Sequence, residues 1–281
     1  MKIKQKLTIK YIRTKLMVLS LLSKRKTAEK TFELFCTPFS KKKYIDPPVF
    51  SSCEIIEYTL NDKKIVGYCW NKGKETKVLI LHGFGSAAHK FHKYIQPLVK
   101  KGYQVVAFDA PAHGKSEGKI TNVLEYAQLI ELVTEKKGPF MGFIAHSFGG
   151  IALSLALENM EHNHQTKVVL IAPATETVSA VNGAFTMLGL QDKAVRKEFD
   201  NVIFEKSGKP TEWFSIRRAM KNIKASVLWV HDEDDDITPI ADALLVKDDN
   251  HPNIKFIITK GLGHRNIYHS SDIKKQVFDF L

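Results

Sequence analysis

Cysteine is scarce in this sequence. The chain of 281 residues has only Cys36, Cys53 and Cys69, and no two of them form a C-x-x-C pair. An odd number of cysteines without paired spacing argues against a disulfide framework and against a zinc site. We therefore expect three buried thiols in a reducing compartment, the cytoplasm, and neither a metal ion nor a cofactor.

Long apolar runs are also missing. The run over residues 16–22 follows a basic stretch but has only 7 residues, and the basic segment 23–26 stands where a signal peptide would have a small-residue cleavage site. Such a run is too short to span a bilayer. We expect an amphipathic helix, either docked on the rest of the protein or lying on an anionic membrane surface as a peripheral contact.

Excess positive charge is absent from most of the chain. Residues 1–45 hold 11 Lys and 2 Arg against two Glu, so this segment carries nearly all of the formal net charge of +12. Nucleic-acid-binding domains usually spread basic side chains, interleaved with aromatic ones, over a folded face. No such pattern follows residue 46, and we expect no nucleic-acid partner.

What the sequence does have is a regular alternation of apolar runs and helical segments. The expected strands are residues 55–60, 65–70, 78–81, 105–108, 140–145, 168–171, 226–230 and 254–258. The expected helices are residues 27–36, 88–100, 121–136, 148–159, 239–247 and 271–280. Continuous apolar strands that alternate with helices predict an α/β fold with a mostly parallel central sheet flanked by helices. The turn Asn61-Asp62 predicts that the first two strands are antiparallel.

One long segment interrupts this alternation. Residues 174–222 lie between two core strands and are rich in helix formers, which predicts a small helical cap insertion. We therefore predict a basic, helical N-terminal extension over residues 1–45 and an α/β domain over residues 46–281 that contains the insertion.

Ser147 is the candidate nucleophile. It stands in Ala145-His146-Ser147-Phe148-Gly149-Gly150, between a buried strand and a helix. Small residues two positions to either side allow a sharp turn that lifts the hydroxyl above the carboxyl edge of the sheet, where chemistry occurs in such folds. The turn also directs the N–H of Phe148 toward the atom under attack. The alternative is an ordinary N-cap serine.

His264 is the candidate base. A serine hydroxyl needs a neighbouring base, and Gly263-His264 follows the last core strand in the chain order Ser, Asp, His. His269 is the second choice, since it is expected on or near the final helix. The side chain of His146 is expected to point elsewhere, because it neighbours Ser147 within the turn.

The acid is expected directly after strand 226–230. The candidates are Asp232, Asp234, Asp235 and Asp236. Only one carboxylate is needed to orient the imidazole, and we choose Asp235, with Asp236 and Asp232 as the next candidates.

The fourth element of the site is expected after strand 78–81, in His82-Gly83-Phe84-Gly85. A backbone N–H near Phe84 would join that of Phe148 in a two-donor oxyanion hole.

These motifs, together with the segment 109–116, occur in the order seen in the α/β-hydrolase superfamily, which the chain resembles from about residue 50 to its end. The resemblance implies a structural role for the loop of Asp109 and His113. The chain departs from the family at Ala112 and Ala145, where glycine is usual.

Two other motifs are nearly present. The acidic segment 232–236 resembles a calcium loop, but Ile237 replaces the required glycine and Ala243 the final glutamate. Gly83-Phe84-Gly85 precedes a helix and Asp109 ends the next strand, as in a dinucleotide site. That hypothesis leaves the pattern of Ser147, Asp235 and His264 unexplained.

The sequence thus predicts a carboxylesterase-like serine hydrolase that cleaves ester or thioester bonds of a small, partly apolar molecule through an acyl-enzyme. Five apolar cap residues are candidates for contacting the substrate: Phe185, Met187, Leu188, Trp213 and Phe214. A non-catalytic ligand-binding protein on the same scaffold and, less favoured, a dinucleotide-dependent oxidoreductase remain the alternatives.

Overall fold

The computed structural model describes residues 3–38 and 45–281, which belong to two compact units. The sheet unit comprises Pro38–Thr175 and Ile216–Leu281. The helical unit comprises Met1–Thr37 and Glu176–Ser215.

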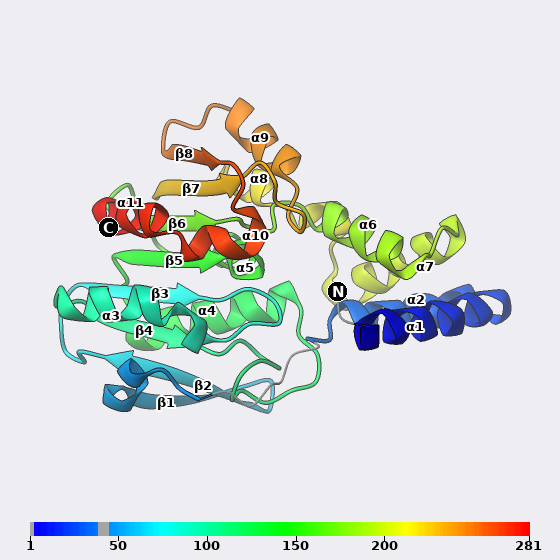
Figure 1. Ribbon diagram of the computed structural model, residues 1–281, viewed down its shortest axis with the longest axis horizontal. Helices are drawn as coiled ribbons and strands as arrows, with labels where there is room; N and C mark the ends of the chain where they lie inside the picture. Colours follow the sequence, from blue (N-terminus) through cyan, green and yellow to red (C-terminus); the bar gives the residue numbers. More distant parts are fainter. Residues whose placement is uncertain (1–2, 39–44) are drawn as a thin grey trace. The chain divides into compact units, whose positions relative to one another are not determined.

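The sheet unit is built on eight strands in the order β1-β2-β4-β3-β5-β6-β7-β8 (Figure 1). Their bounds are β1 Glu54–Leu60, β2 Lys63–Trp70, β3 Lys77–Leu81, β4 Gln104–Phe108, β5 Gly142–His146, β6 Lys167–Ile171, β7 Ser226–Asp232 and β8 Ile254–Thr259. All neighbours from β4 to β8 are parallel, whereas β2 runs antiparallel to both β1 and β4. The predicted α/β fold with a mostly parallel sheet is confirmed.

The turn between β1 and β2 has the conformation that its residues favour. Asn61 and Asp62 have φ of 48° and 59°, in the left-handed region. Asn and Asp tolerate this region better than other residues with a side chain, and two such residues in a row match the twist of a hairpin. The antiparallel start of the sheet follows from this turn.

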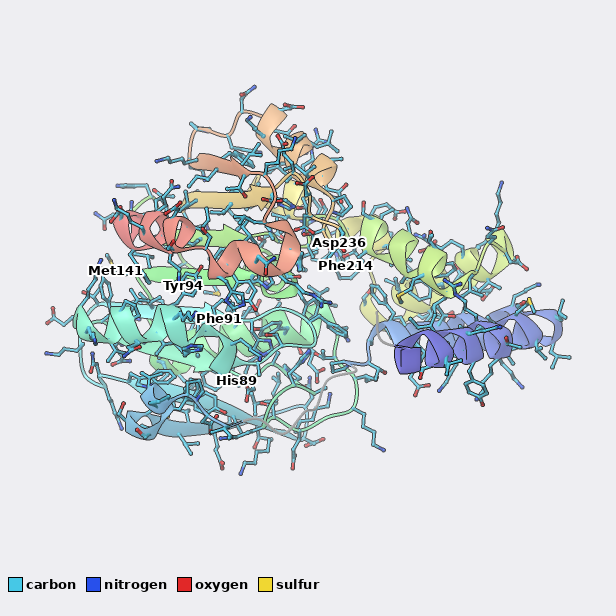
Figure 2. The ribbon with its side chains drawn as sticks, in the orientation of Figure 1. His89, Phe91, Tyr94, Met141, Phe214 and Asp236 are labelled. Carbon is cyan, nitrogen blue, oxygen red and sulfur yellow. The ribbon has the colours of Figure 1, made fainter. Side chains whose placement is uncertain are left out.

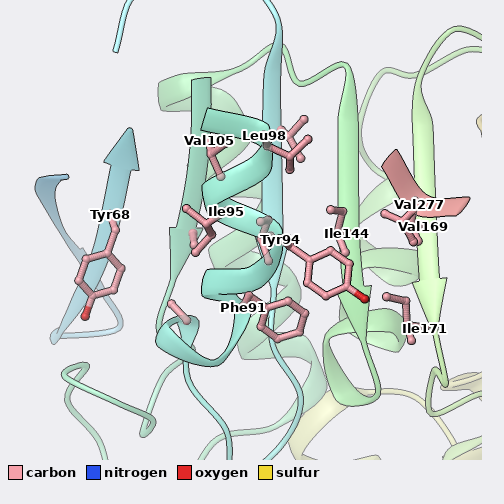
Figure 3. Packing of buried hydrophobic residues seen from close by; sticks show 14 of the residues in the cluster. Tyr68, Phe91, Tyr94, Ile95, Leu98, Val105, Ile144, Val169, Ile171 and Val277 are labelled. Carbon is pink, nitrogen blue, oxygen red and sulfur yellow. The ribbon is translucent and has the colours of Figure 1, made fainter. Parts of the chain in front are cut away.

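Helices cover both faces of the sheet. Those of the sheet unit are α3 His92–Lys100, α4 Val123–Lys137, α5 Phe148–Leu157, α8 Ile216–Ala219, α9 Ile240–Asp248, α10 Gly263–Asn266 and α11 Ser271–Phe280, with single turns η1 Pro48–Ser52, η2 Ala88–Phe91 and η4 Ile267–His269. The core beneath α3 and α11 includes Tyr94, Ile95, Leu98, Val105, Ile144, Val169 and Val277 (Figure 3). Burial on both faces explains why β3 to β7 have nearly continuous apolar sequences.

The helical unit contains α1 Ile3–Leu22, α2 Lys24–Phe35, α6 Thr177–Leu188, α7 Lys193–Ser207 and the turn η3 Thr211–Trp213. An aromatic cluster joins its two chain segments: the rings of Phe32 and Phe35 on α2 each lie 6.0 Å from that of Phe199 on α7. The ring of Phe185 on α6 packs edge-on against Phe199 at 5.2 Å. The helices of the N-terminal segment therefore form one compact unit with those of the insertion.

Ion pairs reinforce the contact between these segments. Lys24 Nζ lies 2.6 Å from Asp192 Oδ2, and the guanidinium of Arg25 binds both carboxylate oxygens of Glu205.

Across residues 3–38 and 45–281, the structure contains no helix with the length and apolar character needed to cross a membrane.

Candidate active site

Ser147 stands at a strained turn between β5 and α5. Its φ of 53° and ψ of −119° lie in a region that residues with a Cβ rarely occupy. The turn is held by its backbone, because the N–H of Ser147 donates to Ile171 O at 3.1 Å and its carbonyl accepts from Gly150 at 2.9 Å and Ala174 at 3.1 Å. The strain is therefore offset by hydrogen bonds to the strand β6 and the loop that follows it.

The small residues around Ser147 are required by close backbone approaches. A Cβ at Gly149 would lie 2.8 Å from the carbonyl oxygen of His82, and one at Gly150 would lie 2.7 Å from the Cβ of Pro173. A Cβ at Gly83 would lie 3.0 Å from that of Ser147. The loop after β3 is thus packed directly on the turn that carries Ser147.

This packing predicts a large cost for one added methyl group. Gly149→Ala should reduce the free energy of unfolding by about 1–3 kcal/mol, because the methyl meets rigid backbone atoms. Gly183→Ala is the matched control: it also lies within a helix, but its added methyl meets nothing within 4 Å. It should stabilise the protein by roughly 0.5–1 kcal/mol. Thermal melting of both variants checks this, and equal effects of the same sign would contradict it.

Three side chains form a continuous hydrogen-bonded chain. His264 Nε2 lies 3.0 Å from Ser147 Oγ, and His264 Nδ1 lies 2.8 Å from Asp235 Oδ2. Thr238 supports this pair, since its hydroxyl donates to Asp235 Oδ2 at 2.8 Å and its oxygen lies 3.1 Å from His264 Nδ1. Asp235 Oδ1 accepts from the backbone N–H groups of Ile237 and Thr238 at 2.9 and 2.8 Å.

The other aspartates of the acidic loop have different partners. The buried Asp232 accepts from the N–H groups of Leu262 and Gly263 and from the Thr259 hydroxyl, and so fixes the segment before His264. Asp234 Oδ2 accepts from the N–H of Gly261 at 2.9 Å. Asp236, labelled in Figure 2, is exposed. Of the predicted acids, only Asp235 is hydrogen-bonded to His264 among the described residues.

The competing histidines are placed elsewhere. His269 lies in η4, where its ring packs 4.1 Å from that of Tyr268. The ring of His146 packs against those of His264 and Tyr268 at 4.8 and 4.6 Å, and its Nε2 lies 3.2 Å from the carbonyl oxygen of His264. His146 therefore supports the backbone of His264 from within the same turn that carries Ser147.

Hydrogen bonds keep the carboxylate of Asp235 in its charged form. Burial alone would raise the pKa of Asp235, but the hydrogen bond from His264 and the two backbone N–H groups outweigh it and hold the pKa below its usual value. Burial lowers the pKa of His146 to about 3, with the nearby His264 contributing. Burial also lowers the pKa of His231, so both rings are neutral near pH 7.

The predicted oxyanion donors lie on neighbouring segments. Phe148 is the first residue of α5, whose first N–H groups have no acceptor within the helix. The rings of Phe84 and Phe148 meet edge-on at 5.4 Å. Two buried histidines fix the loop of Phe84: His113 Nε2 accepts from the N–H of Gly85 at 2.9 Å, and His82 Nε2 accepts from that of Ala110 at 2.9 Å.

The sequence suggested a structural role for the loop of Asp109 and His113 but did not show which segment this loop supports. In the structure this loop supports the segment after β3, and Ala112 within it has φ of 65°, which explains the glycine usual in the family. The carboxylate of Asp109 accepts from the N–H groups of Ala88 and Lys115 and from the Tyr68 hydroxyl. A carboxylate engaged in this way is not presented to a ribose, which weakens the dinucleotide hypothesis.

The five predicted substrate contacts all belong to the helical unit. Phe185, Leu188 and Phe214 are buried, whereas 49% of Met187 is exposed. The ring of Trp213 packs on that of Phe214 at 5.2 Å.

Within residues 3–38 and 45–281, no group of three or more His, Cys, Asp and Glu side chains is placed to hold a metal ion.

Comparisons with known proteins show what the sequence and the fold resemble. The sequence profile described as serine aminopeptidase, S33, matches residues 73–203. An uncharacterized hydrolase of Bacillus subtilis (strain 168), YugF, is 38% identical over 109 residues, which are 36% of this chain and 37% of that protein. The match thus spans little more than a third of this relative.

Solved structures share the fold over a longer stretch. The esterase Pf2001 of Pyrococcus furiosus superimposes with a TM-score of 0.66 and 21% identity over 87% of this chain and 98% of its own. A bacterial membrane phospholipase A superimposes with a TM-score of 0.61 and 14% identity over 98% of this chain and 97% of its own. The chain has the fold of the α/β-hydrolases, and the matched segments resemble hydrolases of that superfamily, as the motifs predicted.

Proposed function

We propose that this protein is a serine hydrolase that cleaves carboxylic ester or thioester bonds through an acyl-enzyme on Ser147. The observation that carries the proposal is the hydrogen-bonded chain from Ser147 Oγ through the imidazole of His264 to Asp235 Oδ2, with distances of 3.0 and 2.8 Å. A serine, a base and an acid in this arrangement are sufficient for acyl transfer on unrelated folds.

In the first half of the reaction, Ser147 Oγ attacks the substrate carbonyl carbon while its proton moves to His264 Nε2. The negative charge that develops on the carbonyl oxygen is stabilised by the N–H groups of Phe148 and Phe84. The carbon–oxygen or carbon–sulfur bond then breaks, and the leaving alcohol or thiol takes the proton from His264. Water hydrolyses the acyl-enzyme by the same steps, and this restores the Ser147 hydroxyl.

Asp235 acts through the imidazole. Its Oδ2 accepts the Nδ1 proton of His264, which keeps Nε2 free to accept the proton of Ser147. The ionised carboxylate also stabilises the imidazolium that forms during the attack. A pKa below the usual value keeps this carboxylate charged throughout the neutral range.

The class of bond follows from the nucleophile, and the name of the Pyrococcus furiosus neighbour, an esterase, agrees with it. The acyl or alkyl group is proposed to be apolar, because the insertion supplies Phe185, Met187, Leu188, Trp213 and Phe214. The contact of these residues with substrate stays a prediction. The main alternative to the proposed hydrolase is a non-catalytic binding protein on the same scaffold.

The test is a panel of p-nitrophenyl esters from acetate to dodecanoate, combined with labelling by a fluorophosphonate. We expect measurable hydrolysis, with kcat/KM changing with chain length, and mass spectrometry should place the label on Ser147. Substrate should slow the labelling. A folded protein that is neither labelled nor active on any ester would favour the binding role over catalysis.

A further inference from the structure

The helix α1 has two apolar faces, of which only one is buried within the helical unit. Leu16 is 1% exposed and marks the buried face. The exposed stripe of α1 consists of Leu7, Tyr11, Val18, Leu21 and Leu22, which are 63%, 68%, 51%, 80% and 80% exposed. The helical unit therefore leaves a full side of this helix uncovered.

The exposed residues form a stripe because of their spacing. Leu7, Tyr11, Val18 and Leu22 follow one another at intervals of four, seven and four residues, which places them on one side of a helix. Single exposed apolar residues are normal in proteins, but several large ones on one side of a helix mark a surface that binds something.

Positive charge accompanies the stripe. Residues 1–22 contain five Lys and one Arg and no acidic residue. Lys10 and Lys15 are exposed, and among the described residues neither has a carboxylate partner. The basic residues of α2 differ, because Lys24 and Arg25 are paired with Asp192 and Glu205 of the same unit. The charge on α1 is thus available to an outside partner.

We propose that α1 binds the surface of an anionic lipid bilayer, with the exposed stripe at the boundary between headgroups and acyl chains and with Lys10 and Lys15 beside the lipid phosphates. A helix with an apolar row flanked by basic residues and lacking acidic ones has the pattern of an interfacial helix. Each basic residue near such a surface strengthens binding about fivefold, and salt weakens the effect. The proposal does not depend on the hydrolytic reaction.

Point variants test it better than removal of the N-terminus, because α2 packs on α7 and its loss would expose the aromatic cluster of the helical unit. The test variant is Leu21→Gln/Leu22→Gln, which removes the most exposed pair and keeps a good helix former. The matched control is Leu244→Gln/Leu245→Gln on α9, an adjacent leucine pair that is 37% and 45% exposed. Circular dichroism checks that both variants are folded.

The measurement is co-sedimentation of the full chain with vesicles of phosphatidylcholine, with and without phosphatidylglycerol, at low and high salt. We expect the full chain to bind the anionic vesicles, with an affinity that falls as the salt concentration rises. The affinity should fall about tenfold or more in the test variant and stay unchanged in the control. Lys10→Gln/Lys15→Gln should lower the affinity for anionic vesicles roughly 25-fold.

Three results would overturn the proposal. The first is a full chain that does not bind anionic vesicles, and the second is equal binding by the two leucine variants. The third is a dimer in sedimentation equilibrium that dissociates in Leu21→Gln/Leu22→Gln while no form binds vesicles, because the stripe would then contact a second copy of the chain.

Discussion

Ser147→Ala is expected to lower ester turnover by about four orders of magnitude or more while the protein stays folded. Alanine removes only the hydroxyl that attacks the substrate, and the backbone hydrogen bonds that hold this turn do not involve the side chain. The strained φ of 53° is the same for both residues, so the substitution does not relieve it. Turnover above about a hundredth of the wild-type rate would remove Ser147 from the mechanism.

The control for this variant is Ser154→Ala on α5, the helix that follows Ser147. Ser154 is 1% exposed, and its hydroxyl donates to the carbonyl oxygen of Gly150 at 2.9 Å. Its loss should cost about 1 kcal/mol of stability and leave turnover unchanged. Ester turnover and thermal melting of both variants separate a chemical from a structural role. Covalent labelling by a fluorophosphonate should be lost in Ser147→Ala and kept in Ser154→Ala.

The fold was predictable from the sequence because each core strand is buried on both faces. A strand such as β5 is then free of polar side chains up to its last residue, His146, and its position can be inferred without tertiary information. The strand ends meet at one edge of a parallel sheet, which is why the positions of Ser147 and His264 pointed to a shared site. The resemblance to the α/β-hydrolase superfamily rests on the same motifs.

The choice among the aspartates could not be settled in this way. Four of them stand within five residues, and they differ only in what their carboxylates reach. Asp235 reaches His264, which is 29 residues away, whereas Asp232 reaches Thr259 and Gly263, which are 27 and 31 residues away. Long-range partners of this kind leave no local pattern in the sequence.

The pairing of the N-terminal helices with the insertion was hidden for a similar reason. Phe32 and Phe199 are each an ordinary apolar residue of an amphipathic helix, and nothing in either helix identifies the other as its partner. In α1 the apolar residues of the buried face and those of the exposed face alternate along the sequence. The short run over residues 16–22 therefore predicted a helix but did not separate its buried face from its exposed one.

Asp235→Asn should reduce turnover by about four orders of magnitude, for a reason specific to this loop. The Oδ1 position accepts two backbone N–H groups, so the amide oxygen of an asparagine must occupy it. The amide nitrogen then replaces Oδ2, 2.8 Å from His264 Nδ1, and donates to that ring nitrogen. The ring proton must move to Nε2, which can no longer accept the proton of Ser147.

The neighbouring aspartates separate this effect from simple damage to the loop. Asp236→Asn should have wild-type activity, because the side chain is exposed. Asp232→Asn should lower the melting temperature and reduce activity less than Asp235→Asn, because it weakens the hydrogen bonds to Leu262 and Gly263 without changing the tautomer of His264. Steady-state kinetics and thermal melting of the three variants measure both effects. If Asp236→Asn were the most damaging change, the acid would be one residue further along the loop and the hydrogen bond from His264 to Asp235 would have no role in catalysis.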